Sequence, residues 1–195
     1  MKKIFLLFVM ALGTTVAAQA QMQAPRFGVK AGANYSGFTG DKGIAKDRLW
    51  GFHAGVTAQF PLTSDNFFAI QPEVLYSQKG AESKNDSYKV KVSYIDVPVL
   101  AHVNAGPLYF EAGPQVSFRV AGEIENNGTT LVDDLDMYKH TSFGYAAGIG
   151  LATPLGVSVG VRYNGDFSQL NDNDNAASYK NSVFMLSLGY TLPAR

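Results

Sequence analysis

Few residues in this sequence are of the kinds that carry out covalent chemistry. Cysteine is absent, which excludes thiol nucleophiles, disulfide bonds and thiolate metal sites. The three histidines are His53, His102 and His140. Hydrolysis would need one of them beside a nucleophile and an orienting third group, and no spacing in the sequence indicates such a set. We therefore expect no catalytic residues and no cofactor, and we predict that the protein is not an enzyme.

The ionisable residues that follow a regular spacing are of a different kind, because they fall on the polar side of an alternating pattern. Seven of them make up a predicted interior polar network: Lys30, His53, Glu73, Asp96, Glu111, Arg119 and Arg162. With Lys79, the cations and carboxylates on this side nearly balance. Charges inside a protein are tolerated when they are paired. We expect His53 to bond one of the carboxylates, Glu73, Asp96 or Glu111.

Residues 171–175 alternate asparagine and aspartate, whose side-chain oxygens suit a calcium ion. The glycine and the terminal glutamate of an EF-hand loop are missing. The same residue types favour turns in solvated loops. We interpret this segment as a loop tip and predict no metal site.

The polar residues are positioned by segments in which apolar and polar side chains alternate with a period of two. In residues 107–120 one face of an extended chain is apolar, and the other is polar and contains glycine. Successive side chains of a β-strand point to opposite faces, so the pattern predicts a strand. Its length matches the roughly 9–11 residues, plus overhang, that a tilted strand needs to cross a bilayer.

The same alternation recurs and predicts eight strands, at 26–38, 49–60, 67–79, 88–104, 107–120, 141–152, 156–167 and 182–192. Long connections, at about 39–48, 80–87, 121–140 and 168–181, alternate strictly with short ones. This is the arrangement of outer-membrane barrels, with short periplasmic turns and long extracellular loops. We therefore predict an all-β fold, an eight-stranded antiparallel up-and-down transmembrane β-barrel. Residues 132–138 could add one helical turn within the third long loop.

One segment departs from the alternation. Val90 and Val92 have the opposite parity from Ile95 and Val97. A β-bulge near Ser93 or Tyr94 would restore the pattern. Alternatively, this segment stands above the membrane, where the pattern is not required.

The polar face decides which side of the barrel points outward. An apolar face turned inward would make a soluble, lipocalin-like barrel with a ligand cavity. The polar face, however, carries many glycines, including Gly28, Gly55, Gly113 and Gly148. Glycine weakens a strand, and a solvent-exposed surface gives no reason to select it. The narrow interior of an eight-stranded barrel does, because it leaves little room for side chains. We expect the apolar face to contact lipid, with aromatic residues near the strand ends.

The first residues have the composition of a secretory signal peptide. Lys2 and Lys3 precede an apolar run over 4–16, and the small residues of Ala18-Gln19-Ala20 form a cleavage site. We predict a signal peptide at 1–20 and an outer-membrane barrel domain at 21–195. The formal net charge is +0, so no nucleic-acid partner is indicated.

Five segments resemble a known family. They are FGVKAGANYSGF (27–38), IQPEVLYSQKG (70–80), YIDVPVLAHV (94–103), GPLYFEAGPQVSF (106–118) and LSLGYTL (186–192). They are similar to the PorT-like outer-membrane β-barrel family of Gram-negative cell envelopes, and the resemblance covers essentially the whole mature chain. It implies a small barrel in the cell outer membrane and little about activity.

From these observations we expect a non-catalytic integral outer-membrane protein with a packed polar interior. Its four long loops would serve envelope structure, or bind another envelope protein or a surface ligand. Its other partners would be outer-membrane lipid and the barrel-assembly machinery. The alternatives are a periplasmic lipocalin-like binder of apolar ligands, an outer-membrane enzyme and a narrow pore.

Overall fold

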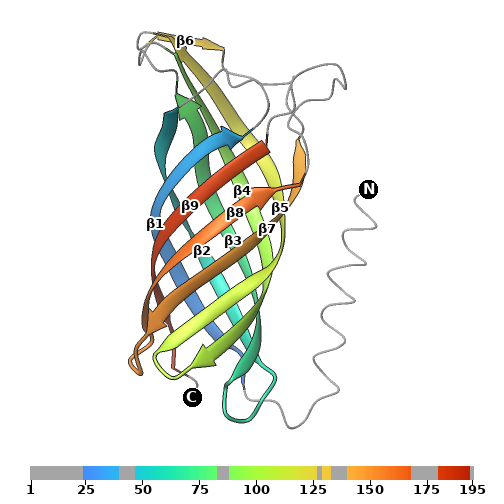
Figure 1. Cartoon of the computed structure of the whole chain (residues 1–195), viewed down its shortest axis with the longest axis vertical. Helices are drawn as coiled ribbons and strands as arrows, with labels where there is room; N and C mark the ends of the chain where they lie inside the picture. The colour runs from blue at the N-terminus through green and yellow to red at the C-terminus, as the bar shows by residue number, and fades with distance from the viewer. Residues whose placement is uncertain are drawn as a thin grey trace.

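The computed structural model describes residues 24–39, 47–82, 88–126, 129–132, 140–167 and 180–193. These residues form nine strands: β1 Arg26–Thr39, β2 Asp47–Pro61, β3 Phe68–Glu82, β4 Tyr88–Ala105, β5 Leu108–Asn126, β6 Thr129–Val132, β7 Thr141–Ala152, β8 Val157–Asp166 and β9 Lys180–Thr191. Eight of them close into a barrel of antiparallel neighbours (Figure 1). The predicted fold class is therefore confirmed.

The order of strands follows the chain, as an up-and-down barrel requires. Each strand pairs with the next, β4 pairs with β5, and β9 returns to pair with β1, which closes the ring. The short strand β6 is outside the ring and pairs with the end of β5. Closure leaves no exposed sheet edge in the ring, and an open edge is not tolerated in hydrocarbon.

Three short turns connect strands at the end where the described chain begins and finishes (Figure 1). Each contains a residue with a positive φ: Asn66 at 59°, Gly106 at 69° and Gly156 at 88°. Asparagine and glycine adopt this left-handed conformation most readily. At this end Leu192 N–H donates to the Phe27 carbonyl, which ties the last described residues to the first strand.

The predicted long loops are shorter than expected, because strands continue into them. Strand β3 extends to Glu82, and β5 continues to Asn126 before β6 begins. Val132, where we expected a helical turn to begin, is the last residue of β6. Residues 133–139 lie outside the described part of the chain, as do 40–46, 83–87 and 168–179.

The irregularity expected near Ser93 and Tyr94 is present, but its extra residue belongs to the neighbouring strand. Ser93 pairs with Ala121 and Tyr94 pairs with Arg119, so Val120 of β5 is the unpaired residue. Strand β4 keeps its alternation, and Val92 is buried. The bulge is therefore at the predicted height, but it does not restore the outward alternation of β4, because Val92 stays inward.

The two faces of the barrel are divided as the membrane interpretation requires. Large apolar side chains stand exposed on the outside, including Val56, Phe110, Val159, Leu186 and Leu188. Lysine, glutamate, asparagine and glutamine side chains are buried inside. The alternative of a lipocalin-like binder was wrong, because the interior is polar and the apolar face points outward.

Aromatic side chains gather near both ends of this outer surface. Toward the end opposite the short turns, Tyr35 and Trp50 lie with ring centroids 4.9 Å apart, and Tyr163 and Phe184 lie 5.1 Å apart. Phe27 stands exposed near the turn end. Such aromatic girdles mark the two interfaces of outer-membrane barrels. No helix in the described residues is long and apolar enough to span a membrane.

Candidate functional site in the barrel interior

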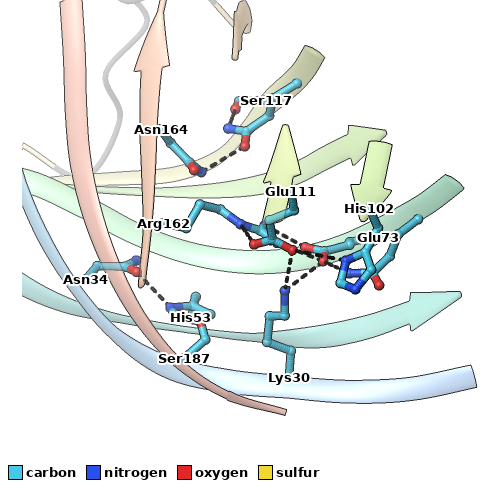
Figure 2. A network of polar contacts seen from close by, with 12 residues as sticks. Lys30, Asn34, His53, Glu73, His102, Glu111, Ser117, Arg162, Asn164 and Ser187 are labelled. Atoms are coloured by element: carbon cyan, nitrogen blue, oxygen red, sulfur yellow. Dashed lines mark hydrogen bonds and ion pairs between the residues drawn. The ribbon is translucent and has the colours of Figure 1, made fainter. Parts of the chain in front are cut away.

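Four charged side chains from four strands meet in the middle of the barrel. Arg162 of β8 donates to Glu73 of β3 through Nη1 and Nη2, at 2.7 and 2.9 Å. Its Nε donates to Oε1 of Glu111 on β5 at 2.6 Å. Lys30 of β1 donates to Oε1 of Glu73 at 2.8 Å. Figure 2 shows these side chains converging from different walls.

We call Lys30, Glu73, Glu111 and Arg162 the ion cluster. All four side chains are buried, and its two cations balance its two carboxylates. Since β8 and β3 are not neighbours, the bonds from Arg162 cross the lumen rather than follow its wall. Gln71 adds a further donor to Glu73, with Nε2 at 2.8 Å from Oε1. The cluster therefore joins opposite sides of the barrel.

His53 has different partners from those we predicted. Its Nδ1 lies 2.8 Å from Oδ1 of Asn34, and its Nε2 lies 2.9 Å from Oγ of Ser187. No hydrogen bond joins His53 to Glu73, Asp96 or Glu111 among the described residues. The predicted carboxylate partner was therefore wrong.

The orientation of Asn34 settles which nitrogen of neutral His53 carries the proton. Nδ2 of Asn34 donates to the carbonyls of Phe52 and Gln78 and to Oγ of Ser77. Its Oδ1 must therefore accept from Nδ1–H of His53. The other nitrogen, Nε2, accepts from the hydroxyl of Ser187.

Asp96 belongs to a separate pair. Its Oδ1 lies 2.8 Å from Nζ of Lys79, and that ammonium also lies 4.8 Å from the ring centroid of Tyr94. Arg119 is half-buried, and its Nε has no hydrogen-bond partner in the described chain. Of the seven predicted residues, four thus meet in the ion cluster, while His53, Asp96 and Arg119 lie elsewhere.

Several side chains that complete the interior were not predicted as site residues. Asn34 and Ser187 hold His53, and Asn164 donates to Oε1 of Gln115 at 2.8 Å. Tyr109 of β5 stacks on His102, with ring centroids 4.9 Å apart. Their inward parity was readable in the sequence, but the pairings depend on the register and tilt of strands that are far apart in the chain.

The other two histidines lie toward opposite ends. His140 is exposed and lies just before β7, where its carbonyl accepts from Arg119 N–H. His102 is buried, with Nδ1 3.8 Å from Oε2 of Glu111. The described residues hold no group of three or more histidines and carboxylates that could bind a metal ion. The asparagine and aspartate segment at 171–175 lies outside the described residues.

A cavity of about 540 Å³, lined by both polar and apolar side chains, occupies the turn end of the lumen. Its lining includes Arg26, Asn66 and Pro107 at the mouth, and Lys30, His102 and Glu111 at the inner end. Lys30 and Glu111 of the ion cluster thus form part of this inner end. The lumen is therefore a cavity open toward the short turns, which is the periplasmic end of an outer-membrane barrel.

Comparisons with known proteins agree with this architecture. Among solved structures, Ail, the attachment invasion locus protein of Yersinia pestis, is similar with a TM-score of 0.53 and 16% identity, over 87% of this chain and 100% of that chain. Neisserial surface protein A is similar with a TM-score of 0.54 and 14% identity, over 87% and 100%. At such identities the likeness shows the fold alone. A search of curated proteins gave no match.

The family model is more informative, because it matches most of the sequence. The model described as outer membrane protein beta-barrel domain covers residues 17–172. With the closed barrel and the outward apolar face, the match places the protein in the outer membrane. The chain belongs to the family of outer membrane protein beta-barrel domains.

Proposed function

We propose that this protein is a non-catalytic outer-membrane barrel that acts through its extracellular end, in envelope structure or in binding another envelope protein or a surface ligand. The observation that carries the proposal is the ion cluster, which ties four walls of the lumen together. A sealed lumen leaves the two ends and the lipid-facing surface as the places where the protein can act.

The extracellular end has a surface to offer. β4 and β5 contain 18 and 19 residues, whereas β8 contains 10. Since roughly 9–11 residues span the membrane, one side of the barrel projects well beyond it. In Figure 1, β4, β5 and β6 rise at the end away from the short turns. This projecting side is the part of the described chain best suited to meet a partner.

The finer assignments belong to the same proposal. The resemblance of the sequence to PorT-like barrels supports a role in the envelope of a Gram-negative cell. The apolar outer face would contact outer-membrane lipid, and the barrel-assembly machinery would insert the chain after removal of the 1–20 signal peptide. Residues 1–23 lie outside the described part of the chain, so these steps rest on the sequence.

Labelling of single cysteines tests this arrangement, because the natural chain has no cysteine to interfere. Asn126→Cys lies at the end of β5 on the projecting side, and Leu155→Cys lies in the exposed turn between β7 and β8. A membrane-impermeant maleimide should label the first variant in intact cells and the second after permeabilisation. The opposite order would overturn the proposed orientation and its extracellular surface.

One arrangement favours an enzyme as the second candidate. Asn34, His53 and Ser187 have the hydrogen-bond order of an orienter, a base and a nucleophile. All three are buried, however, and none of them lines the cavity at the turn end. A substrate carbonyl needs room beside the serine oxygen, so we interpret the trio as structural.

A fluorophosphonate probe separates these two functions. The folded barrel should remain unlabelled, and Ser187→Ala should change nothing in that assay. Labelling of the wild-type barrel that disappears in Ser187→Ala would favour the enzyme and contradict the non-catalytic proposal.

A further inference from the structure

The cavity at the periplasmic end has an inner wall with unsatisfied hydrogen-bonding groups. Nδ1 of His102 and Oε2 of Glu111 are both buried and have no hydrogen-bond partner in the described chain. Both residues line the cavity of about 540 Å³, a volume within the range of small-molecule sites. Buried polar atoms in folded proteins nearly always have a partner, so these two atoms call for one.

The hydrogen-bonding role of His102 follows from its neighbour Asn104. Nδ2 of Asn104 donates to the carbonyl of Asn66 at 2.8 Å, which fixes the orientation of the amide. Its Oδ1 therefore lies 3.2 Å from Nε2 of His102 and must accept a proton from it. Neutral His102 then carries its proton on Nε2, and Nδ1 is an acceptor.

Two acceptors thus face each other across the inner end of the cavity. Nδ1 of His102 and Oε2 of Glu111 lie 3.8 Å apart, too far for a direct hydrogen bond. The same oxygen lies 3.8 Å from Nζ of Lys30. Figure 2 shows His102 next to Glu111 and the other members of the ion cluster. A guest at this point must bring donors.

The charges nearby select a neutral donor over a cation. The ion cluster already balances two cations with two carboxylates, and Lys30 lies beside the acceptor oxygen. An ammonium placed there would add an unbalanced charge next to Lys30 inside the barrel. A hydroxyl group donates equally well and adds no charge.

The rest of the lining suits the same chemistry. The neutral polar side chains that line the cavity include Thr57, Gln59, Asn66, Gln71 and Ser158. Oδ1 of Asn66 is a third buried acceptor without a hydrogen-bond partner. Amides and hydroxyls both donate to and accept from the hydroxyls of a sugar.

We propose that the periplasmic cavity binds a neutral polyhydroxylated ligand, a mono- or disaccharide unit, whose hydroxyl groups donate to His102 Nδ1 and Glu111 Oε2. The site lies at the opposite end from the proposed extracellular surface, so either proposal can fail without the other.

Saturation-transfer NMR on the full barrel in an amine-oxide detergent tests this inference, since glycoside detergents would themselves supply a sugar. The probes are glucose, N-acetylglucosamine and trehalose, with putrescine as a cationic comparison. At least one sugar should bind, and putrescine should not. Binding of putrescine alone, or of none of the probes, would overturn the proposal.

Variants on either side of the ion cluster locate the site. His102→Leu removes one acceptor at similar size and should weaken sugar binding about tenfold or more. Ser158→Phe should block the cavity from another strand. Gln115→Leu, inside the barrel but outside the cavity, is the matched control and should leave binding within about twofold. A band that migrates faster in the unboiled sample than in the boiled sample shows that each variant is folded.

Equal sugar binding by His102→Leu and the wild type would contradict the assigned site. The ¹⁵N shifts of the His102 ring provide a second check. They should show the proton on Nε2 and none on Nδ1, whereas a proton on Nδ1 would remove one of the two acceptors and overturn the proposal.

Discussion

Arg162 is the residue on which the interior depends most, because it is the contact shared by Glu73 and Glu111. Arg162→Gln would leave two buried carboxylates with only Lys30 to oppose them. Removing one member of a buried ion pair costs about 3–5 kcal/mol, and we expect a loss of unfolding free energy in that range. Unfolding by guanidinium in detergent micelles measures this loss of unfolding free energy.

Arg119→Gln is the control for this prediction, because no ion pair joins Arg119 to a carboxylate among the described residues. It should change the unfolding free energy by less than about 1 kcal/mol. Equal midpoints for the two variants would contradict the assigned role of the ion cluster.

Tyr109 depends on two glycines, Gly150 of the neighbouring strand β7 and Gly160 of β8 beyond it. A Cβ added at Gly150 or Gly160 would collide with its ring or its hydroxyl. Gly160→Ala should therefore destabilise the barrel by about 1–3 kcal/mol, the usual range for overpacking. The double variant Tyr109→Leu/Gly160→Ala should lose less than the sum of its parts. Strictly additive losses in the same unfolding assay would exclude this contact.

The sequence predicted which residues face inward better than it predicted their partners. Parity placed Lys30, Glu73 and Arg162 on one face, because side chains alternate along any strand. His53 shows the limit of that reasoning. Its partners come from β1 and β9, and only the register across those strands selects Asn34 and Ser187 over a carboxylate.

At the scale of elements, the turn between β2 and β3 is held by Asp65. Hydrogen bonds from the Thr63 side chain and from Phe67 N–H, the latter at 3.0 Å, hold the pKa of the Asp65 carboxyl below its usual value. A lowered pKa stabilises the fold above the unfolded-state pKa of about 3.9, and that contribution is lost as the pH falls through the folded-state pKa. Carbon-13 NMR titration should show the low value.

Thr63→Ala removes the largest cause of that shift, and the pKa of Asp65 should then rise toward its ordinary value. An unchanged titration in this variant would mean that Thr63 does not hold the turn as described.

A variant in strand β8 tests which face of the sheet contacts lipid. Val159 points to lipid and is exposed on the outer surface. Val159→Arg should impair insertion, because a cation on the lipid-facing surface is destabilising, by up to about 2–4 kcal/mol at the bilayer midplane. Leu155→Arg, in the neighbouring turn, should insert normally. The two variants are compared by folding into liposomes, where a folded barrel migrates faster on a gel before boiling than after. Normal insertion of Val159→Arg would contradict the assigned orientation of the two faces.

The lengths of the elements were the least predictable feature. The apolar alternation marks where a strand meets lipid, and it stops where the strand leaves the membrane. Backbone pairing does not stop there, so β5 continues to Asn126 through residues that were predicted as a loop. The extra residue at Val120 was not predicted, because the change of parity was noticed in β4, whose own alternation continues unbroken.

For the molecule as a whole, the barrel is held together in two ways. Pairing of β1 with β9 closes the ring, and the ion cluster joins opposite walls across the lumen. Eight strands enclose a space that side chains can fill, and here they fill it with paired charges and amides. The barrel therefore has a cavity at the turn end of its lumen, and the long strands β4 and β5 project at the other end.

Single-channel recording in planar bilayers tests this closure most directly. Purified wild-type barrel, shown to be folded by its unboiled gel band, should insert without producing steady conductance steps. Stable open steps in most insertions would mean that ions pass the ion cluster, and would contradict the sealed lumen on which the proposed function rests.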